Sequence, residues 1–144
     1  MWSPDLLALE RAHVVHLALW GALSLALGGG LALALLARRA HAPLAASFGV
    51  QMAVVGSAEL AYAAIRWRGM AERDYASALR LATHLRLAMV AEVWVIAAGA
   101  IVLWAGSIVL RRLALSGAGM AWMAHGAVLF LLDRAVLAHL TRGV

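Results

Sequence analysis

Residues 91–103 read AEVWVIAAGAIVL, a stretch in which one carboxylate, Glu92, stands among apolar side chains. The stretch is the centre of a longer apolar run, residues 87–110. An α-helix needs about 20 predominantly apolar residues to cross the hydrocarbon core of a bilayer. The run is long enough, so it predicts a transmembrane helix that carries Glu92 inside the membrane.

Three further apolar runs cover residues 14–37, 43–65 and 117–139. The composition agrees with a membrane protein, because 65% of the 144 residues are hydrophobic and only 13% are charged, whereas about half of the residues in soluble domains are apolar. The connectors are short, which makes neighbouring helices antiparallel. We therefore predict one domain, residues 1–144, an all-α integral membrane four-helix transmembrane bundle in up-down-up-down order.

The connector before the third run is polar and reads AERDYASALRLATHLR at residues 71–86. Its apolar side chains, Tyr75, Leu79 and Leu81, alternate with arginines in a spacing that suits an amphipathic helix. We expect this segment to lie at the membrane interface and to lead into the third helix. At the other end of that helix, we expect SGAG at residues 116–119 to turn the chain into the fourth helix.

All twelve basic residues are arginines, and they stand at the ends of the apolar runs, where cations anchor at lipid headgroups. Most lie on the side that holds both termini, and only Arg38, Arg39, Arg111 and Arg112 lie on the other side. The side richer in arginine usually faces the cytoplasm, so we predict cytoplasmic N- and C-termini. The arginines form no contiguous basic face, and we predict no nucleic-acid partner.

Three acids are expected at one level inside the membrane. With a rise of about 1.5 Å per residue, Glu59 and Glu92 lie about 9 Å from the side of the termini. Asp133 lies at a similar level if the fourth helix reaches His139, and His16 of the first helix lies toward the same side. We predict a buried polar layer of Glu59, Glu92, Asp133 and His16, because a carboxylate facing lipid costs at least about 2.5 kcal/mol.

Several arrangements would satisfy these acids. Two neighbouring carboxylates could share one proton, because both resist being ionised together. The acids could pair with basic side chains from the same side, namely Arg86, Arg134, His13 or His16. They could bind a metal ion together with a histidine. Three roles for these acids remain open. They could pack helices together as polar contacts, form a proton or ion pathway, or form a metal or ligand site.

A second polar layer is predicted nearer the middle of the membrane, formed by Gln51, His125 and Ser24. His125 is the best candidate for a haem ligand, but a second histidine at matching depth on a facing helix is missing. The chain has no cysteine, which excludes disulfides, thiolate catalysis and iron–sulfur clusters. No catalytic motif is visible. We therefore predict no enzymatic activity and no cofactor, with a metal ion or a b-type haem as the less favoured alternative.

Small residues line two of the predicted helices. Gly21, Ser24 and Gly28 follow one face of the first helix, and Ala53, Gly56 and Ser57 follow the second. Such stripes let helices approach closely in lipid, where no hydrophobic force holds them together. They predict contact between the first two helices.

Several motifs together resemble a family of small bacterial four-helix integral membrane proteins of unassigned function. Arg11 followed by WGALSLALG at residues 20–28 is similar to its first helix, and FGVQM at residues 48–52 to its Phe-x-x-Gln-Met signature. Glu92, Trp94 and Gly99 resemble the acid, aromatic and glycine of its third helix. The fourth helix resembles the family in Gly117, Gly119, Gly126, Leu129 and Asp133.

The chain also departs from that family. The family usually has Asp at the place of Glu92, Gln at the place of His125, and a polar, Asn-rich face where this chain reads AVVGSAEL at residues 53–60. The resemblance implies a four-helix fold in a bacterial inner (cytoplasmic) membrane and implies no activity.

From the sequence we therefore expect a non-enzymatic accessory, assembly or scaffolding subunit. Its partners would be the lipid bilayer and either copies of itself or other membrane proteins. The alternative is a homo-oligomeric proton- or ion-coupled transporter or channel that uses the buried carboxylates. A second alternative is a membrane protein that binds a metal ion or haem.

Overall fold

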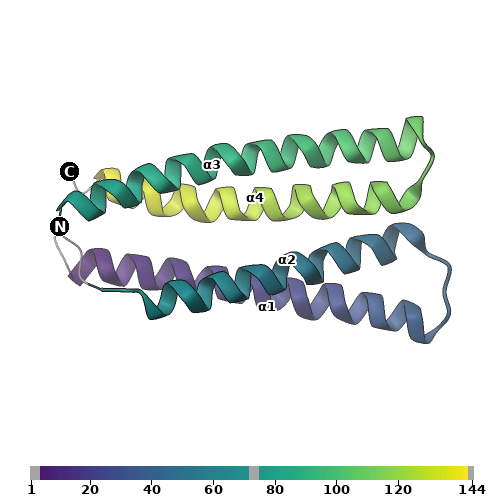
Figure 1. The fold of residues 1–144 in the computed structure, drawn as a ribbon, viewed down its shortest axis with the longest axis horizontal. Helices are drawn as coiled ribbons and strands as arrows, with labels where there is room; N and C mark the ends of the chain where they lie inside the picture. The colour runs from purple at the N-terminus through teal and green to yellow at the C-terminus, as the bar shows by residue number, and fades with distance from the viewer. Residues whose placement is uncertain (1–3, 72–74, 143–144) are drawn as a thin grey trace.

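The chain forms four long helices in the computed structural model, which describes residues 4–71 and 75–142 (Figure 1). The helices are α1 (Pro4–Ala37), α2 (Pro43–Arg68), α3 (Tyr75–Trp104) and α4 (Leu113–Arg142), and α3 continues into a π-helical turn, η1 (Ala105–Val109). The described residues include no strand. All four helices are long and apolar enough to cross a membrane. The prediction of an all-helical chain with four such helices is confirmed.

The helices form two antiparallel hairpins, α1 with α2 and α3 with α4 (Figure 1). The hairpins meet mainly through α2 and α4, whereas α1 and α3 make little contact with the opposite hairpin. The start of α1, the end of α2, the start of α3 and the end of α4 lie at one end of the bundle, called here the termini end. The two tight hairpin turns, residues 38–42 and 110–112, lie at the opposite end, called the turn end.

Glycines bring the backbones of α1 and α2 together. A Cβ added to Gly28 would lie 2.5 Å from the carbonyl oxygen of Gly49, and one added to Gly56 would lie 2.6 Å from that of Gly21. The two pairs lie one heptad apart on each helix, so the close contact extends over about two helical turns. The predicted packing stripe is present on α1, although Ser57 of α2 faces outward.

The α3–α4 hairpin uses the same device. A Cβ added to Gly99 would lie 2.8 Å from the carbonyl oxygen of Gly119, and one added to Gly119 would lie 2.5 Å from that of Gly99. Gly117 approaches α2 instead, against the backbone of Leu44. Residues 116–119 are thus needed inside a helix, where they permit close approach on two sides.

The expected turn at residues 116–119 is therefore wrong. The chain reverses at residues 110–112, where Arg111 adopts a left-handed backbone with φ of 50°. The third helix begins earlier than the apolar run 87–110 indicates, because the described part of the polar segment, from Tyr75 onward, is helical and leads directly into it, as expected for this segment.

Candidate functional site

A cavity of about 580 Å³ lies in the half of the bundle nearest the termini end, and all four helices line it. Part of its wall is apolar, formed by side chains such as Val14, Leu17, Leu85 and Leu129. The rest carries eight carboxylate, imidazole or guanidinium side chains: Glu10 and His13 from α1, Glu59 and Arg66 from α2, Arg80, His84 and Glu92 from α3, and Asp133 from α4. Sequence positions far apart thus meet around one space.

The three acids predicted to share one level all line this cavity. Glu59, Glu92 and Asp133, called here the acid layer, come from α2, α3 and α4. Asp133 lies well inside α4, because that helix continues to Arg142. Glu92 is half-buried and interacts with Asp133, a second acid. A hydrogen bond between two carboxyl groups requires a proton on one of them.

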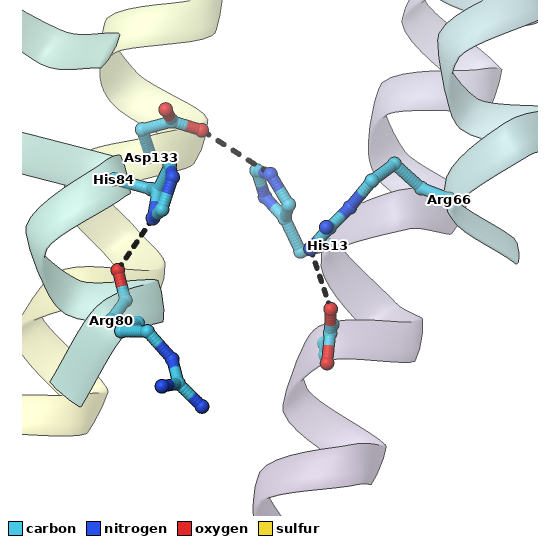
Figure 2. A network of polar contacts seen from close by, with 6 residues as sticks. His13, Arg66, Arg80, His84 and Asp133 are labelled. Carbon is cyan, nitrogen blue, oxygen red and sulfur yellow. Dashed lines mark hydrogen bonds and ion pairs between the residues drawn. The ribbon is translucent and has the colours of Figure 1, made fainter. Parts of the chain in front are cut away.

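Asp133 faces a histidine from the other hairpin. The Nε2 atom of His13 lies 3.2 Å from the Oδ1 atom of Asp133 (Figure 2). The other ring nitrogen of His13, Nδ1, is buried and has no hydrogen-bond partner among the described residues. His16 is exposed on α1, turned away from the cavity-lining face of that helix. The structure thus places His13 beside the acid layer, and it does not bring His16 to it.

Glu10 and Arg66 close the cavity wall between α1 and α2. The Arg66 guanidinium donates to the Oε1 atom of Glu10 over 2.6 Å, and the Glu10 side chain is only 3% exposed. Neither residue belongs to the polar layers predicted from the sequence. The helical repeat that links Glu59, Tyr62 and Arg66 on α2 was the available signal, since these residues share one face.

Glu59 also contacts the second predicted layer. Its Oε1 atom lies 3.1 Å from the Nδ1 atom of His125, and the indole N–H of Trp20 points at the same nitrogen from 3.2 Å. The Trp20 and His125 rings meet edge to face, with centroids 5.6 Å apart. His125 therefore contacts the acid layer through Glu59, and the contact links α1, α2 and α4.

The Nδ1 atom of His125 cannot serve both neighbours fully. A ring nitrogen carries either a hydrogen or one lone pair. If Nδ1 accepts the N–H of Trp20, Glu59 can bond to it only through a carboxyl proton. If Nδ1 donates to Glu59, the indole N–H of Trp20 loses this acceptor. The choice between these partners therefore depends on where one proton resides.

The other two members of the second layer lie elsewhere. Gln51 accepts a hydrogen bond from the indole of Trp122 over 3.3 Å, which joins α2 to α4. Ser24 is fully buried against Gly56, and its hydroxyl has no hydrogen-bond partner among the described residues. Neither side chain lines the cavity. None of the three members of the second layer therefore lines the cavity: His125 contacts Glu59 of the acid layer, and Gln51 and Ser24 lie between helices.

Arg80 and His84 lie on α3 at the exposed edge of the cavity (Figure 2). The Nδ1 atom of His84 lies 2.8 Å from the carbonyl oxygen of Arg80. A carbonyl can only accept, so Nδ1 carries the hydrogen and Nε2 remains free to accept a proton. Arg86 and Arg134, considered above as partners of the acids, are exposed and do not line the cavity.

The described residues include no group of three or more His, Asp or Glu side chains placed to hold one metal ion. What the cavity offers is a set of groups that bind and release protons, reaching from the exposed His84 to the buried Glu59. Carboxylates and imidazoles spaced in this way are found along proton and ion pathways of membrane proteins.

No protein-family model, curated protein or solved structure matches this chain. The resemblance to bacterial four-helix membrane proteins therefore remains a prediction from motifs, and the cavity is the basis for the function argued below.

Proposed function

We propose that this chain is a membrane transporter or channel, active alone or as an oligomer, that moves protons or small cations through its acid-lined cavity. We place it in a bacterial inner membrane with the termini end at the cytoplasm, as the distribution of arginines predicts. The observation that carries the proposal is the cavity of about 580 Å³ in contact with all three members of the acid layer.

Polar packing alone does not require such a space. Acids that only hold helices together would be covered by close contacts, because a buried charge needs its partners at hydrogen-bond distance. Here the wall of the cavity leaves one carboxylate oxygen of Glu59 and one of Glu92 without a hydrogen-bond partner among the described residues. A water molecule occupies about 30 Å³ in the liquid, so the cavity has room for water beside the acid layer.

An enzymatic role is less well supported. The side chains that line the cavity include no serine, threonine or lysine that could act as a nucleophile. The metal and haem alternatives gain no support from the described residues, since their acids and histidines do not gather into a set of metal ligands. Proton and cation binding needs only the carboxylates and imidazoles that line the cavity.

The test is proton flux into liposomes that contain the purified full-length protein, driven by a pH gradient. We expect the wild type to conduct and Glu92→Gln to lose the flux, because the amide cannot release a proton. Arg68→Gln serves as the control, since Arg68 is exposed at the end of α2 and outside the cavity. Circular dichroism and gel filtration check that both variants remain folded. A wild type without flux, or a conducting Glu92→Gln variant, would contradict the proposal.

The accessory-subunit role remains a second candidate because of one feature of α3. Trp94 lies in the middle of this helix and is 71% exposed, whereas tryptophans in membrane proteins concentrate at the two interfaces. It borders a shallow apolar groove formed with Phe130 and Leu137 of α4. A protein partner would cover this groove. A chain that is monomeric in mild detergent, with no co-purifying protein, would count against this role.

A further inference from the structure

The acid layer contains more hydrogen-bond acceptors than the surrounding side chains satisfy. Glu59 is only 7% exposed, yet its Oε2 atom is buried and has no hydrogen-bond partner within the described part of the chain. The Oε2 atom of Glu92 is in the same condition. Both residues line the cavity. Leaving buried oxygens unsatisfied costs about 1–3 kcal/mol each, which favours an occupant that donates hydrogen bonds.

The distribution of charge indicates the sign of that occupant. Three of the four cavity acids face a basic side chain: Glu10 faces Arg66, Asp133 faces His13, and Glu59 faces His125. Glu92 instead faces Asp133. No salt bridge to Glu92 is present among the described residues. A positive charge next to Glu92 would allow both acids to be ionised side by side, without a shared proton.

An anion fits less well. The Arg66 guanidinium is already bonded to Glu10. Arg80 is exposed at the edge of the cavity, away from the buried oxygens. An inorganic cation would need several oxygens around it at short distance, and the described residues provide no such cluster of acids and histidines.

The volume and the apolar walls of the cavity indicate that the cation is organic, with an apolar group attached to its charged group. Pockets for small molecules have volumes of about 300–1,000 Å³ and mostly apolar walls with few polar groups. This cavity, at about 580 Å³, has such walls in Leu17, Leu85 and Leu129. A bare proton needs no such volume.

We propose that the cavity binds a small hydrophobic amine in its protonated form, with the ammonium group at the acid layer and the apolar body against Leu17, Leu85 and Leu129. The ammonium provides three N–H donors for the carboxylates of the acid layer, whose three residues line the cavity. This inference rests on the proposed function, because it names the cation that the cavity carries.

The experiment compares three probes that share one apolar body and differ in charge: 2-phenylethylammonium, 2-phenylethanol and 3-phenylpropanoate. Binding to the full-length protein in lipid nanodiscs is measured by calorimetry at fixed pH and corrected against empty nanodiscs. We expect the ammonium to bind. The alcohol and the carboxylate should bind at least about ten-fold more weakly, because they lose hydrogen bonds to charged groups.

Two variants then locate the site. Glu92→Gln should weaken ammonium binding about ten-fold or more while it leaves alcohol binding unchanged. Arg68→Gln, which removes a positive charge outside the cavity, should not weaken it. If Glu92→Gln does not fold, Ala88→Phe provides the second variant, since it fills the cavity and leaves every acid in place; it should abolish ammonium binding.

Three results would overturn the inference: equal binding of ammonium and alcohol, full ammonium affinity in the Glu92→Gln or Ala88→Phe variant, or no ammonium binding to folded wild type. Glu92-dependent proton flux without ammonium binding would overturn the inference that the cavity binds an amine, and it would leave the proposed function standing. Ammonium binding without any proton flux would contradict the proposed function and leave the amine site standing.

Discussion

Glu10 is the most deeply buried of the carboxylates that line the cavity, with 3% exposure against 7% for Glu59 and 8% for Asp133. A carboxylate in this position needs a charged donor, because removing an ion from water costs several kcal/mol even after relaxation. Arg66 supplies that donor from the neighbouring helix at 2.6 Å. The pair therefore adds a charge-assisted hydrogen bond to the glycine-mediated packing of α1 against α2.

Arg66→Gln should lower the free energy of unfolding by about 1.5–2 kcal/mol, the lower part of the range for hydrogen bonds to charged groups. The lower part applies because the Arg66 side chain is 34% exposed. Arg68→Gln, two residues further on and exposed, should change it by less than about 0.5 kcal/mol. Unfolding in mixed detergent and SDS micelles, followed by circular dichroism, measures both. Equal effects of the two substitutions would show that the buried pair contributes nothing specific.

For single residues, the sequence predicted how deep each polar side chain lies in the membrane, but it did not predict toward which neighbouring helix the side chain points. The rise per residue placed Glu59, Glu92 and Asp133 at one level, and the structure brings them to one cavity. Rotation about a helix axis depends on packing, which a single apolar run does not encode. His16 was therefore preferred over His13, and the contact of Trp20 with His125 was not foreseen.

At the scale of elements, the hairpins depend on glycines that face each other across antiparallel helices. Lipid supplies no hydrophobic force between helices, so close backbone contact and dispersion must hold them together. The apolar runs predicted the four helices well. The same glycines misled the prediction at residues 116–119, because glycine marks a turn and a close helix contact equally well. Only the position of the facing backbone distinguishes the two.

Gly28 and Gly30 on α1 provide a matched test of this packing. A Cβ at Gly28 would lie 2.5 Å from the Gly49 carbonyl oxygen, whereas one at Gly30 meets nothing within 4 Å. Gly28→Ala should destabilise the protein by about 1–3 kcal/mol, as overpacking does. Gly30→Ala should be neutral or stabilise it by up to about 1 kcal/mol, because alanine is the better helix former. SDS unfolding midpoints compare the two variants. Loss of stability in Gly30→Ala alone would refute the assignment of this interface.

At the scale of the whole molecule, the two hairpins meet mainly along α2 and α4, and the cavity separates them toward the termini end. The contact between His13 and Asp133 crosses that space. No sequence pattern predicts such a cavity, since its existence depends on how two separately packed hairpins lie against each other. The sequence accordingly favoured an accessory subunit, and the cavity shifts the proposal toward transport.

Water in the cavity is the physical condition on which transport depends, and cysteine labelling tests it directly. The chain contains no cysteine, so a single introduced thiol reports on its own site. Ala88 lines the cavity, whereas Ala100 is exposed on α3 outside it. A thiol reacts as the thiolate, which forms in water and not in an apolar environment.

Ala88→Cys should therefore react with a cationic, membrane-impermeant methanethiosulfonate reagent, and Ala100→Cys should not. The reaction of Ala88→Cys should be fast in inside-out vesicles and slow in intact cells, because the termini end is predicted to face the cytoplasm. Labelling of denatured protein in SDS verifies that both thiols are intact. If Ala88→Cys stays as unreactive as Ala100→Cys from either side, the cavity is dry, and its acids serve as polar packing between the hairpins.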